Sequence, residues 1–393
     1  FVFFATATRT WIVSSDFFLP DFAEVRELFE TDAPLKPELE KIVRELWTDL
    51  QQAHKFGALL RIEEKFDLEL ESVISEAKKY ALQGMYEETI SDYYKFRTNF
   101  FDKLHSAVEQ HNKKVGLSFL SFKTADAITF LELLTQKYDV AVANPPYTDS
   151  GDFGGELKTF IEANYKKPFK FSTNLYATFI KRCAELSNGT GKLALIHPLT
   201  FMYIKTFEDV RKFILGKLHI NILVDYGLSN MFGAVMVDPA FYVLEKGITS
   251  QKPSLFISLD QYTRTPNEKY KKDFCLTALD NYVAGNSDKH NYSIDQSKLK
   301  VIDSYPFIYW ISDGFRKNFS EKTIKYYFNT AQGLITGNND RFLRFWWENQ
   351  HIGSKWIPFA KGGPFNKWFG NLWLTVNWHE DGKEIKNFFD SNG

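Results

Sequence analysis

The residues with the clearest chemical meaning are Asn144-Pro145-Pro146-Tyr147, which directly follow the apolar run Tyr138–Ala143. A loop at the carboxyl end of a parallel strand is where α/β sheets bind their ligands. The two prolines fix φ and lack N–H groups, so this turn presents carbonyl oxygens. Asn144 adds an amide oxygen and Tyr147 adds a flat ring. Two acceptors beside a ring suit a planar amine, although a stiff turn with no catalytic role has the same composition.

An exocyclic amine on a purine is a poor nucleophile because its lone pair is delocalised into the ring. Accepting both of its N–H hydrogens favours the pyramidal form and directs the lone pair at an electrophile. Positioning and electrostatics then suffice for attack on a methyl group carried by a sulfonium. Inside a duplex the amine is paired, so the base must be flipped out and held between flat faces. Tyr147 is predicted to be one such face.

The surrounding pattern predicts an α/β sheet, because short apolar runs alternate with helical periodicity. We expect strands at 138–143, 192–197, 221–226 and 240–245, a further short strand at 117–122, and helices at 125–136, 155–165, 172–186 and 207–218. The sheet should be mostly parallel. The segment 233–239 is too short for a crossover helix, so the strand that follows it is predicted to be antiparallel.

The first hundred residues read as helical. Apolar residues between Leu39 and Leu50 recur at spacings of three and four, which lays one stripe along a helix reaching about residue 55. Two more helices are predicted at 68–82 and 86–108. The triplet Glu63-Glu64-Lys65 has the acidic-x-lysine form of a metal nuclease, but lacks an upstream Pro-Asp context, and a solvated helix end is the preferred interpretation.

Composition excludes several classes. The chain has 393 residues, 44% hydrophobic and 25% charged, with no apolar run long enough to span a membrane, so we expect a soluble cytoplasmic protein. Two cysteines build neither a disulfide scaffold nor a cysteine-rich zinc site, and no metal site is predicted. Residues 1–140 hold 17 basic and 24 acidic side chains, whereas 141–393 hold 31 and 25. This excess permits a nucleic-acid partner without requiring one. Because the chain starts at Phe1 in mid-pattern, we expect a piece of a longer polypeptide.

The run Tyr138–Tyr147 resembles motif IV of the amino-methyltransferases that modify adenine N6 with S-adenosylmethionine. Residues 190–198, Thr-Gly-Lys-Leu-Ala-Leu-Ile-His-Pro, are similar to the next strand motif of the gamma subclass. Residues 230–241 resemble its motif VIII, whose aromatic side chain stacks on the flipped base. Phe232 occupies that position, and a core residue at a strand end is the alternative interpretation.

The resemblance extends to the phage-exclusion (BREX) adenine-specific methyltransferases, the PglX-like proteins. It is carried by Phe56–Ile62, the serine-containing loop after Tyr147, Thr336–Phe342 and Lys361–Phe365. It implies a Rossmann-like core that binds S-adenosylmethionine. The glycine-rich cofactor loop of such enzymes is not recognisable, so the core is predicted to be incomplete. Asn144 and Asp126 are the predicted cofactor contacts, although a helix-capping role explains Asp126 equally well.

The last part of the chain combines basic side chains with many aromatics. Arg341, Arg344, Lys361 and Lys367 are predicted to contact DNA, because cations grip phosphates and flat rings fit against bases. The resemblance makes this region the start of a target-recognition domain. Two alternatives stay open: the tryptophans form a small β-rich core, and the two arginines hold this domain against the methyltransferase sheet.

The predicted organisation is a helical insertion (1–112), a methyltransferase core with the Asn-Pro-Pro-Tyr loop (113–250), a connecting segment with short strands (251–304) and the start of a β-rich target-recognition domain (305–393). The predicted function is site-specific adenine-N6 methylation of double-stranded DNA at a flipped base, in an antiphage system that supplies further protein partners. Alternatives are the methylating part of a type IIG restriction–modification enzyme and a DNA-recognition platform without activity. A protein glutamine methyltransferase shares the loop, but the helical insert and tryptophan-rich tail favour a larger substrate.

Overall fold

The computed structural model consists of two compact units, Phe1–Glu321 and Lys322–Gly393. The residues it describes are 2–5, 10–13, 21–26, 37–80, 95, 99, 129–130, 133–229, 237–247, 252–322, 324–329, 333–350, 352–368 and 370–388. The predicted strand at 117–122 lies outside them, and so does the predicted helix at 86–108 apart from residues 95 and 99.

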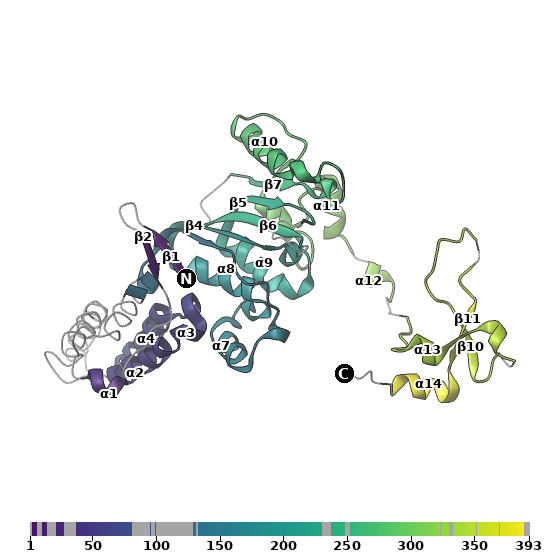
Figure 1. Cartoon of the computed structure of the whole chain (residues 1–393), viewed down its shortest axis with the longest axis horizontal. Helices are drawn as coiled ribbons and strands as arrows, with labels where there is room; N and C mark the ends of the chain where they lie inside the picture. The colour runs from purple at the N-terminus through teal and green to yellow at the C-terminus, as the bar shows by residue number, and fades with distance from the viewer. Residues whose placement is uncertain are drawn as a thin grey trace. The chain divides into compact units, whose positions relative to one another are not determined.

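The first unit is built on a six-stranded sheet of order β3-β4-β6-β5-β7-β8 (Figure 1). Its strands are β3 (Tyr138–Ala143), β4 (Ser187–Pro198), β5 (Leu218–Asp225), β6 (Pro239–Lys246), β7 (Ser254–Ser258) and β8 (Asn291–Ile294). β3 pairs with β4 in parallel, and β5 with β7. β6 lies antiparallel between β4 and β5, which confirms the predicted direction of that strand. β7 and β8 are also antiparallel, so two of the five described pairings in this sheet are parallel and three are antiparallel. The prediction of a mostly parallel sheet is therefore wrong, because β6 is inserted between β4 and β5.

Side-chain alternation in the central strands separates two apolar layers. Leu223 and Phe256 face the main core, to which α8 (Leu175–Leu186) and α9 (Glu208–Lys217) contribute. Val224, Leu255 and Ile257 point the other way and pack with Ala278 of α10 (Lys271–Val283). This period of two is what a sheet buried on both faces requires. The predicted α/β fold is confirmed, and α7 (Gly155–Tyr165) has the predicted bounds.

The face that carries α10 is covered at only one end among the described residues. A groove of about 400 Å³ runs along it, lined by side chains of β3, β4, β6, β5, β7 and α10. Val140 and Val142 of β3 are 57% and 75% exposed on the described surface. Nearly all of the groove's lining is apolar, so this part of the sheet has the composition of an interior surface.

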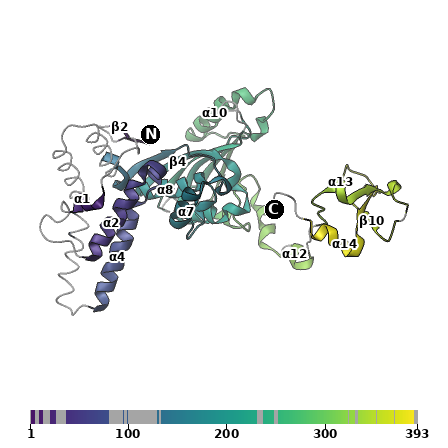
Figure 2. The same ribbon diagram turned by 60° about the horizontal axis from the view of Figure 1, so that its bottom comes forward.

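The N-terminal part contains a β-hairpin, β1 (Val2–Ala5) with β2 (Thr10–Val13), and a set of helices. The helices are α1 (Phe22–Val25), α2 (Pro37–Gln51), α3 (Ala53–Phe56) and α4 (Ile62–Tyr80). α2 and α4 lie side by side (Figure 2). The predicted stripe is confirmed, because Leu39, Ile42, Val43, Leu46 and Leu50 are buried.

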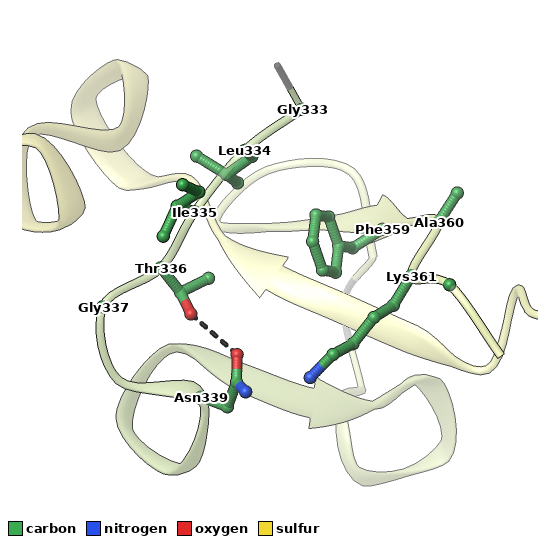
Figure 3. A pocket seen from close by; sticks show the side chains of 10 residues that line it. Gly333, Leu334, Ile335, Thr336, Gly337, Asn339, Phe359, Ala360 and Lys361 are labelled. Carbon is green, nitrogen blue, oxygen red and sulfur yellow. Dashed lines mark hydrogen bonds between the residues drawn. The ribbon is translucent and has the colours of Figure 1, made fainter. Parts of the chain in front are cut away.

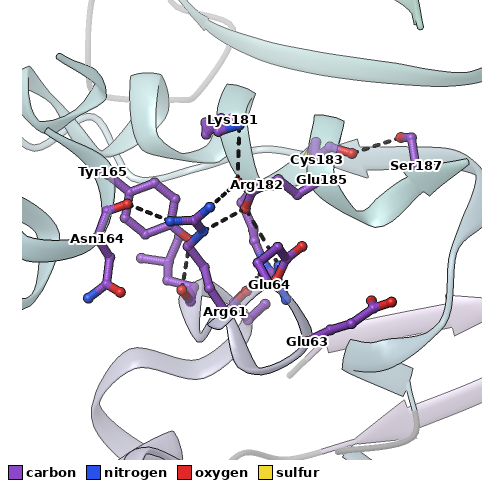
Figure 4. A network of polar contacts seen from close by, with 12 residues as sticks. Arg61, Glu63, Glu64, Asn164, Tyr165, Lys181, Arg182, Cys183, Glu185 and Ser187 are labelled. Atoms are coloured by element: carbon purple, nitrogen blue, oxygen red, sulfur yellow. Dashed lines mark hydrogen bonds and ion pairs between the residues drawn. The ribbon is translucent and has the colours of Figure 1, made fainter. Parts of the chain in front are cut away.

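A network of ion pairs joins the start of α4 to α8 (Figure 4). Arg61 donates to both carboxylate oxygens of Glu185, at 3.0 and 2.6 Å, and to the Asn164 carbonyl at 2.7 Å. Arg182, which is 1% exposed, donates to the Ala58 carbonyl at 2.7 Å and to both oxygens of Glu64 at 3.2 Å. Glu64 is therefore a structural ion-pair partner, which disfavours the nuclease interpretation.

Two expected boundaries differ from the structure. The segment 251–304 is more than a connection: β7 and β8 extend the sheet, and Ile257 is fully buried beside Ala278. The aromatic run after residue 304 also begins inside the first unit. Phe307 is fully buried and Tyr309 is 4% exposed, both in the main core. Apolar side chains complete that core there, so the second unit starts near residue 322, after α11 (Asp313–Lys317).

The second unit contains a three-stranded antiparallel sheet of order β10-β11-β9. Its elements are α12 (Ile324–Tyr327), α13 (Asn339–Phe342), β9 (Leu343–Phe345), β10 (Trp356–Phe359), β11 (Leu374–Asn377) and α14 (His379–Lys386). Its buried core is Phe342, Leu343, Val376 and Ile385. Trp346, Trp347 and Trp368 are 52%, 58% and 89% exposed, so these three tryptophans do not form that core.

Candidate active site

The Asn-Pro-Pro-Tyr loop leaves the carboxyl end of β3, as predicted. β3 ends at Ala143, which lies opposite Leu195 of β4, and Pro145 is buried below the turn. Asn144 is exposed rather than packed into the core. The hydroxyl of Tyr147 donates a hydrogen bond to Oδ1 of Asn144 at 3.1 Å. The turn therefore brings the predicted amide and ring side chains together at the surface.

This hydrogen bond orients the Asn144 amide without using up its acceptor capacity. A carbonyl oxygen has two lone pairs, so Oδ1 can still accept from a second donor. Burial raises the pKa of Tyr147, which keeps its hydroxyl protonated and donating at neutral pH. The side chain of Asn144 is thus held by a neighbour that stays in one protonation state.

Asn174 ties the loop to the N-terminus of α8. This side chain is 2% exposed, accepts from the backbone N–H of Tyr176 at 3.0 Å as a helix cap, and donates to Oδ1 of Asp149 at 2.6 Å. The N–H of Leu175 also donates to the Thr148 carbonyl at 3.0 Å. The chain leaving Tyr147 is therefore fixed on a helix end. Sequence reasoning missed Asn174, although Ser-Thr-Asn directly before a helical run is a capping signal.

His197 supports the neighbouring strand end. It is completely buried, and burial lowers its pKa to about 3, so the ring is neutral. Its Nε2 lies 2.6 Å from the Tyr242 hydroxyl and its Nδ1 lies 3.0 Å from the Pro198 carbonyl. The ring of Tyr176 stacks on it with centroids 4.3 Å apart. This cluster links β4, β6 and α8. Sequence reasoning assigned His197 no role beyond its place in a strand motif.

Two predicted site residues, Asp126 and Phe232, lie outside the described residues, so their roles stay predictions. The residues on either side of segment 230–236 pair with each other: Ser229 N–H donates to the Val237 carbonyl at 2.8 Å, and Val237 N–H donates back at 3.0 Å. Within the described part of the chain, no group of three His, Cys, Asp or Glu side chains is placed to hold a metal ion. No helix there is both long and apolar enough to cross a membrane.

The predicted DNA contacts in the second unit divide into two kinds. Arg341 donates to Oε1 of Glu384 at 3.2 and 2.6 Å, and Arg344 donates to the carbonyls of Asp340 and Leu343 at 2.6 Å each. Both arginines are therefore bonded within their own unit, and their contact with DNA stays a prediction. Lys361 instead reaches across an open hollow of about 490 Å³ toward Asn339, which accepts from Thr336 at 2.8 Å (Figure 3).

Comparisons with known proteins agree with the resemblance that the Asn-Pro-Pro-Tyr loop carries. Residues 43–232 match the family model of the Eco57I restriction-modification methylase. The chain is 28% identical over 281 residues to the adenine-specific methyltransferase PglX of Lacticaseibacillus casei (strain Zhang), covering 65% of this chain and 22% of that protein. It is 30% identical over 278 residues to the adenine-specific methyltransferase BrxX of Escherichia coli O9:H4 (strain HS), covering 67% and 22%. The chain thus spans about a fifth of the length of these relatives.

Solved structures give partial likenesses. A type I restriction-modification methyltransferase subunit from Streptococcus thermophilus aligns over 48% of this chain and 45% of its own, with 11% identity and a TM-score of 0.34. The type IIG restriction endonuclease BpuSI aligns over 41% and 19%, with 16% identity and a TM-score of 0.31. The family match and the two adenine-specific relatives carry the likeness: residues 43–232 of this chain are similar to the Eco57I restriction-modification methylases.

Proposed function

We propose that this chain is the methylating part of a site-specific DNA adenine-N6 methyltransferase of a BREX-type antiphage system. The observation that carries the proposal is the exposed Asn144 amide, held 3.1 Å from the Tyr147 hydroxyl at the carboxyl end of β3. The sequence similarity to PglX and BrxX supports the choice of adenine and of this kind of system. The substrate is double-stranded DNA with one adenine flipped out, and the setting is the cytoplasm with other proteins of the system.

The roles of the loop follow from its chemistry. Oδ1 of Asn144 and the Pro145 carbonyl accept the two hydrogens of the adenine amine, and Pro146 keeps the turn rigid. Tyr147 and Phe232 hold the base between two aromatic faces. With both hydrogens held, the lone pair of N6 points away from the clamp, towards the methyl donor. The new C–N bond would form as the S–CH3 bond of the sulfonium breaks, which would leave a neutral thioether, and one N6 hydrogen would leave as a proton to water.

S-adenosylmethionine would supply the methyl group as a sulfonium. Of the two predicted cofactor contacts, only Asn144 lies among the described residues, and its Oδ1 accepts a hydrogen of the adenine amine. The described side chains therefore fit the part of the site that would hold the adenine amine. Asp126 and the cofactor half stay predictions.

The decisive experiment measures transfer of labelled methyl from S-adenosylmethionine to DNA. Asn144→Ala should abolish transfer, while the circular dichroism and thermal unfolding of the protein stay those of the wild type. Asn286→Ala, an exposed asparagine in the same unit, is the matched control and should leave transfer unchanged. Unimpaired transfer by Asn144→Ala would refute the assignment.

Two alternatives have their own tests. A DNA-recognition platform without activity would release no heat with S-adenosylmethionine in a calorimetric titration. The methylating part of a type IIG restriction–modification enzyme would come with DNA cleavage. Neither alternative is favoured by a contact in the described residues.

A further inference from the structure

The loop that joins β10 to β11 exposes two large aromatic side chains. Phe365 and Trp368 are each 89% exposed, more than any other large apolar side chain in the described part of the chain. The loop runs out from the strands of the second unit as a long excursion (Figure 1). Isolated exposed apolar residues are ordinary, but two aromatics three residues apart in one loop, each with almost its whole surface in water, indicate an interaction site.

The loop is braced by its own side chains. Nδ2 of Asn366 donates to Oδ1 of Asn371 at 3.1 Å and to the Pro364 carbonyl at 3.3 Å, and Nδ2 of Asn371 donates to the same carbonyl at 3.4 Å. Asn371 has φ of 64°. A Cβ on Gly363 would lie 2.7 Å from Oδ1 of Asn371, so a side chain there would displace the Asn371 amide. The two aromatics thus lie beside side chains that hydrogen-bond to one another, and such bracing lowers the entropy lost on binding.

The charged side chains of the chain segment that contains the loop have one sign. Residues 349–379 contain three lysines and no aspartate or glutamate. Lys367 lies 5.4 Å from the centre of the Trp368 ring. Lys361 begins the loop and reaches over the hollow beside Thr336 and Asn339 (Figure 3). Lysines that flank exposed rings are complementary to a polymer of bases and phosphates.

We propose that Phe365 and Trp368 stack on DNA bases at a step that is opened in the complex, while Lys361 and Lys367 contact the flanking phosphates. This inference rests on the proposed function, because it takes DNA as the substrate. A closed duplex hides the faces of its bases, so stacking requires a base step that is unstacked or a base that is extruded. The loop would therefore favour DNA with a locally opened helix.

The test compares the affinity of the chain for two labelled duplexes, one fully paired and one with a single unpaired base, at salt concentrations from 50 to 200 mM. The wild type should prefer the duplex with the unpaired base. Phe365→Ala/Trp368→Ala should lose about 5- to 140-fold of the affinity for that duplex, since one stacked base is worth about 1–3 kcal/mol. The salt dependence of this variant should match that of the wild type.

Two variants separate the contributions. Lys361→Ala/Lys367→Ala should lower the slope of log affinity against log salt by about 1.8, because each phosphate contact contributes about 0.9. Phe328→Ala removes an aromatic that is 69% exposed elsewhere in the second unit, and its affinity should equal that of the wild type. Near-ultraviolet circular dichroism checks that each variant keeps its fold.

Equal affinity of wild type and Phe365→Ala/Trp368→Ala for both duplexes would overturn the inference. So would self-association of the wild type that the same variant abolishes without a change in DNA affinity, because a second copy would then occupy the loop. Neither result touches the proposed function if Asn144→Ala still abolishes methyl transfer and still binds DNA. A wild type that neither binds DNA nor transfers methyl would contradict the proposed function itself.

Discussion

Replacing Arg182 by methionine removes the best-buried cation of the network between α4 and α8. The change leaves the Glu64 carboxylate and the Ala58 carbonyl without this donor. Breaking a buried ion pair from one side costs about 3–5 kcal/mol. The lower end applies here, because the Glu64 side chain is 18% exposed and keeps Lys137 at 3.6 Å. We therefore expect the free energy of unfolding to fall by about 3 kcal/mol.

That loss corresponds to a lowering of the melting temperature by about 4–5 °C. The first unit has 321 residues, and an unfolding entropy of about 2.1 cal/mol/K per residue makes each kcal/mol worth about 1.5 °C. Urea unfolding followed by far-ultraviolet circular dichroism gives the free energy directly. Arg182→Met/Glu64→Leu is the matched variant, since it removes both charges and should recover at least half of the loss.

The penalty should also depend on pH. Burial opposes ionisation of Glu64, but Arg182 first, then Lys137 and Arg61, hold its pKa below the ordinary value. A lowered folded pKa gives stability that is present above the unfolded pKa of about 4.3 and is lost as the pH falls through the folded value. The difference between wild type and Arg182→Met should thus be smaller at pH 4 than at pH 7. A loss under 1 kcal/mol at pH 7, or an equal loss in the double variant, would refute this account.

Three further changes test other parts of the structure. Gly227→Ala places a Cβ 2.6 Å from Thr263 at φ of +66° and should cost about 1–3 kcal/mol, whereas Gly216→Ala meets open space in α9 and should be neutral or stabilising in the same thermal melts. Burial raises the pKa of Asp225, so the ionisation of its carboxyl group costs stability as the pH rises through the folded pKa. The urea midpoint of Asp225→Asn should therefore rise relative to that of the wild type between pH 4 and pH 7. Asn174→Ala should cost about 1–2 kcal/mol and slow methyl transfer with DNA affinity unchanged, and equal rates would contradict its role in fixing the loop.

Local sequence signals predicted the elements whose limits are set locally. The bounds of β3 match the prediction because a β-branched run stops at two prolines, which cannot continue a sheet. β7 was not predicted as part of the sheet. Its three apolar residues, Leu-Phe-Ile, lie in a polar segment, and so short an apolar run occurs both in strands and in loops. Only the pairing with β5 distinguishes them, and that contact is distant in sequence.

The candidate site was predictable in the same uneven way. Asn144 and Tyr147 form a contiguous motif, so their chemistry is legible without coordinates. The partners of Arg341 are not, because Glu384 lies 43 residues away and the sequence reports a charge without its neighbours. For the same reason, sequence composition did not distinguish the two arginines, which are hydrogen-bonded within their own unit, from the lysines of the β10–β11 loop.

The central proposal is that Asn144 and Tyr147 hold adenine while its amino group is methylated. The most direct measurement is the identity of the methylated product, by mass spectrometry of nucleosides from DNA treated with the wild type and with Asn144→Ala. We expect N6-methyladenine with the wild type and none with the variant. A methyl group on another base, or equal N6-methyladenine from both proteins, would contradict it.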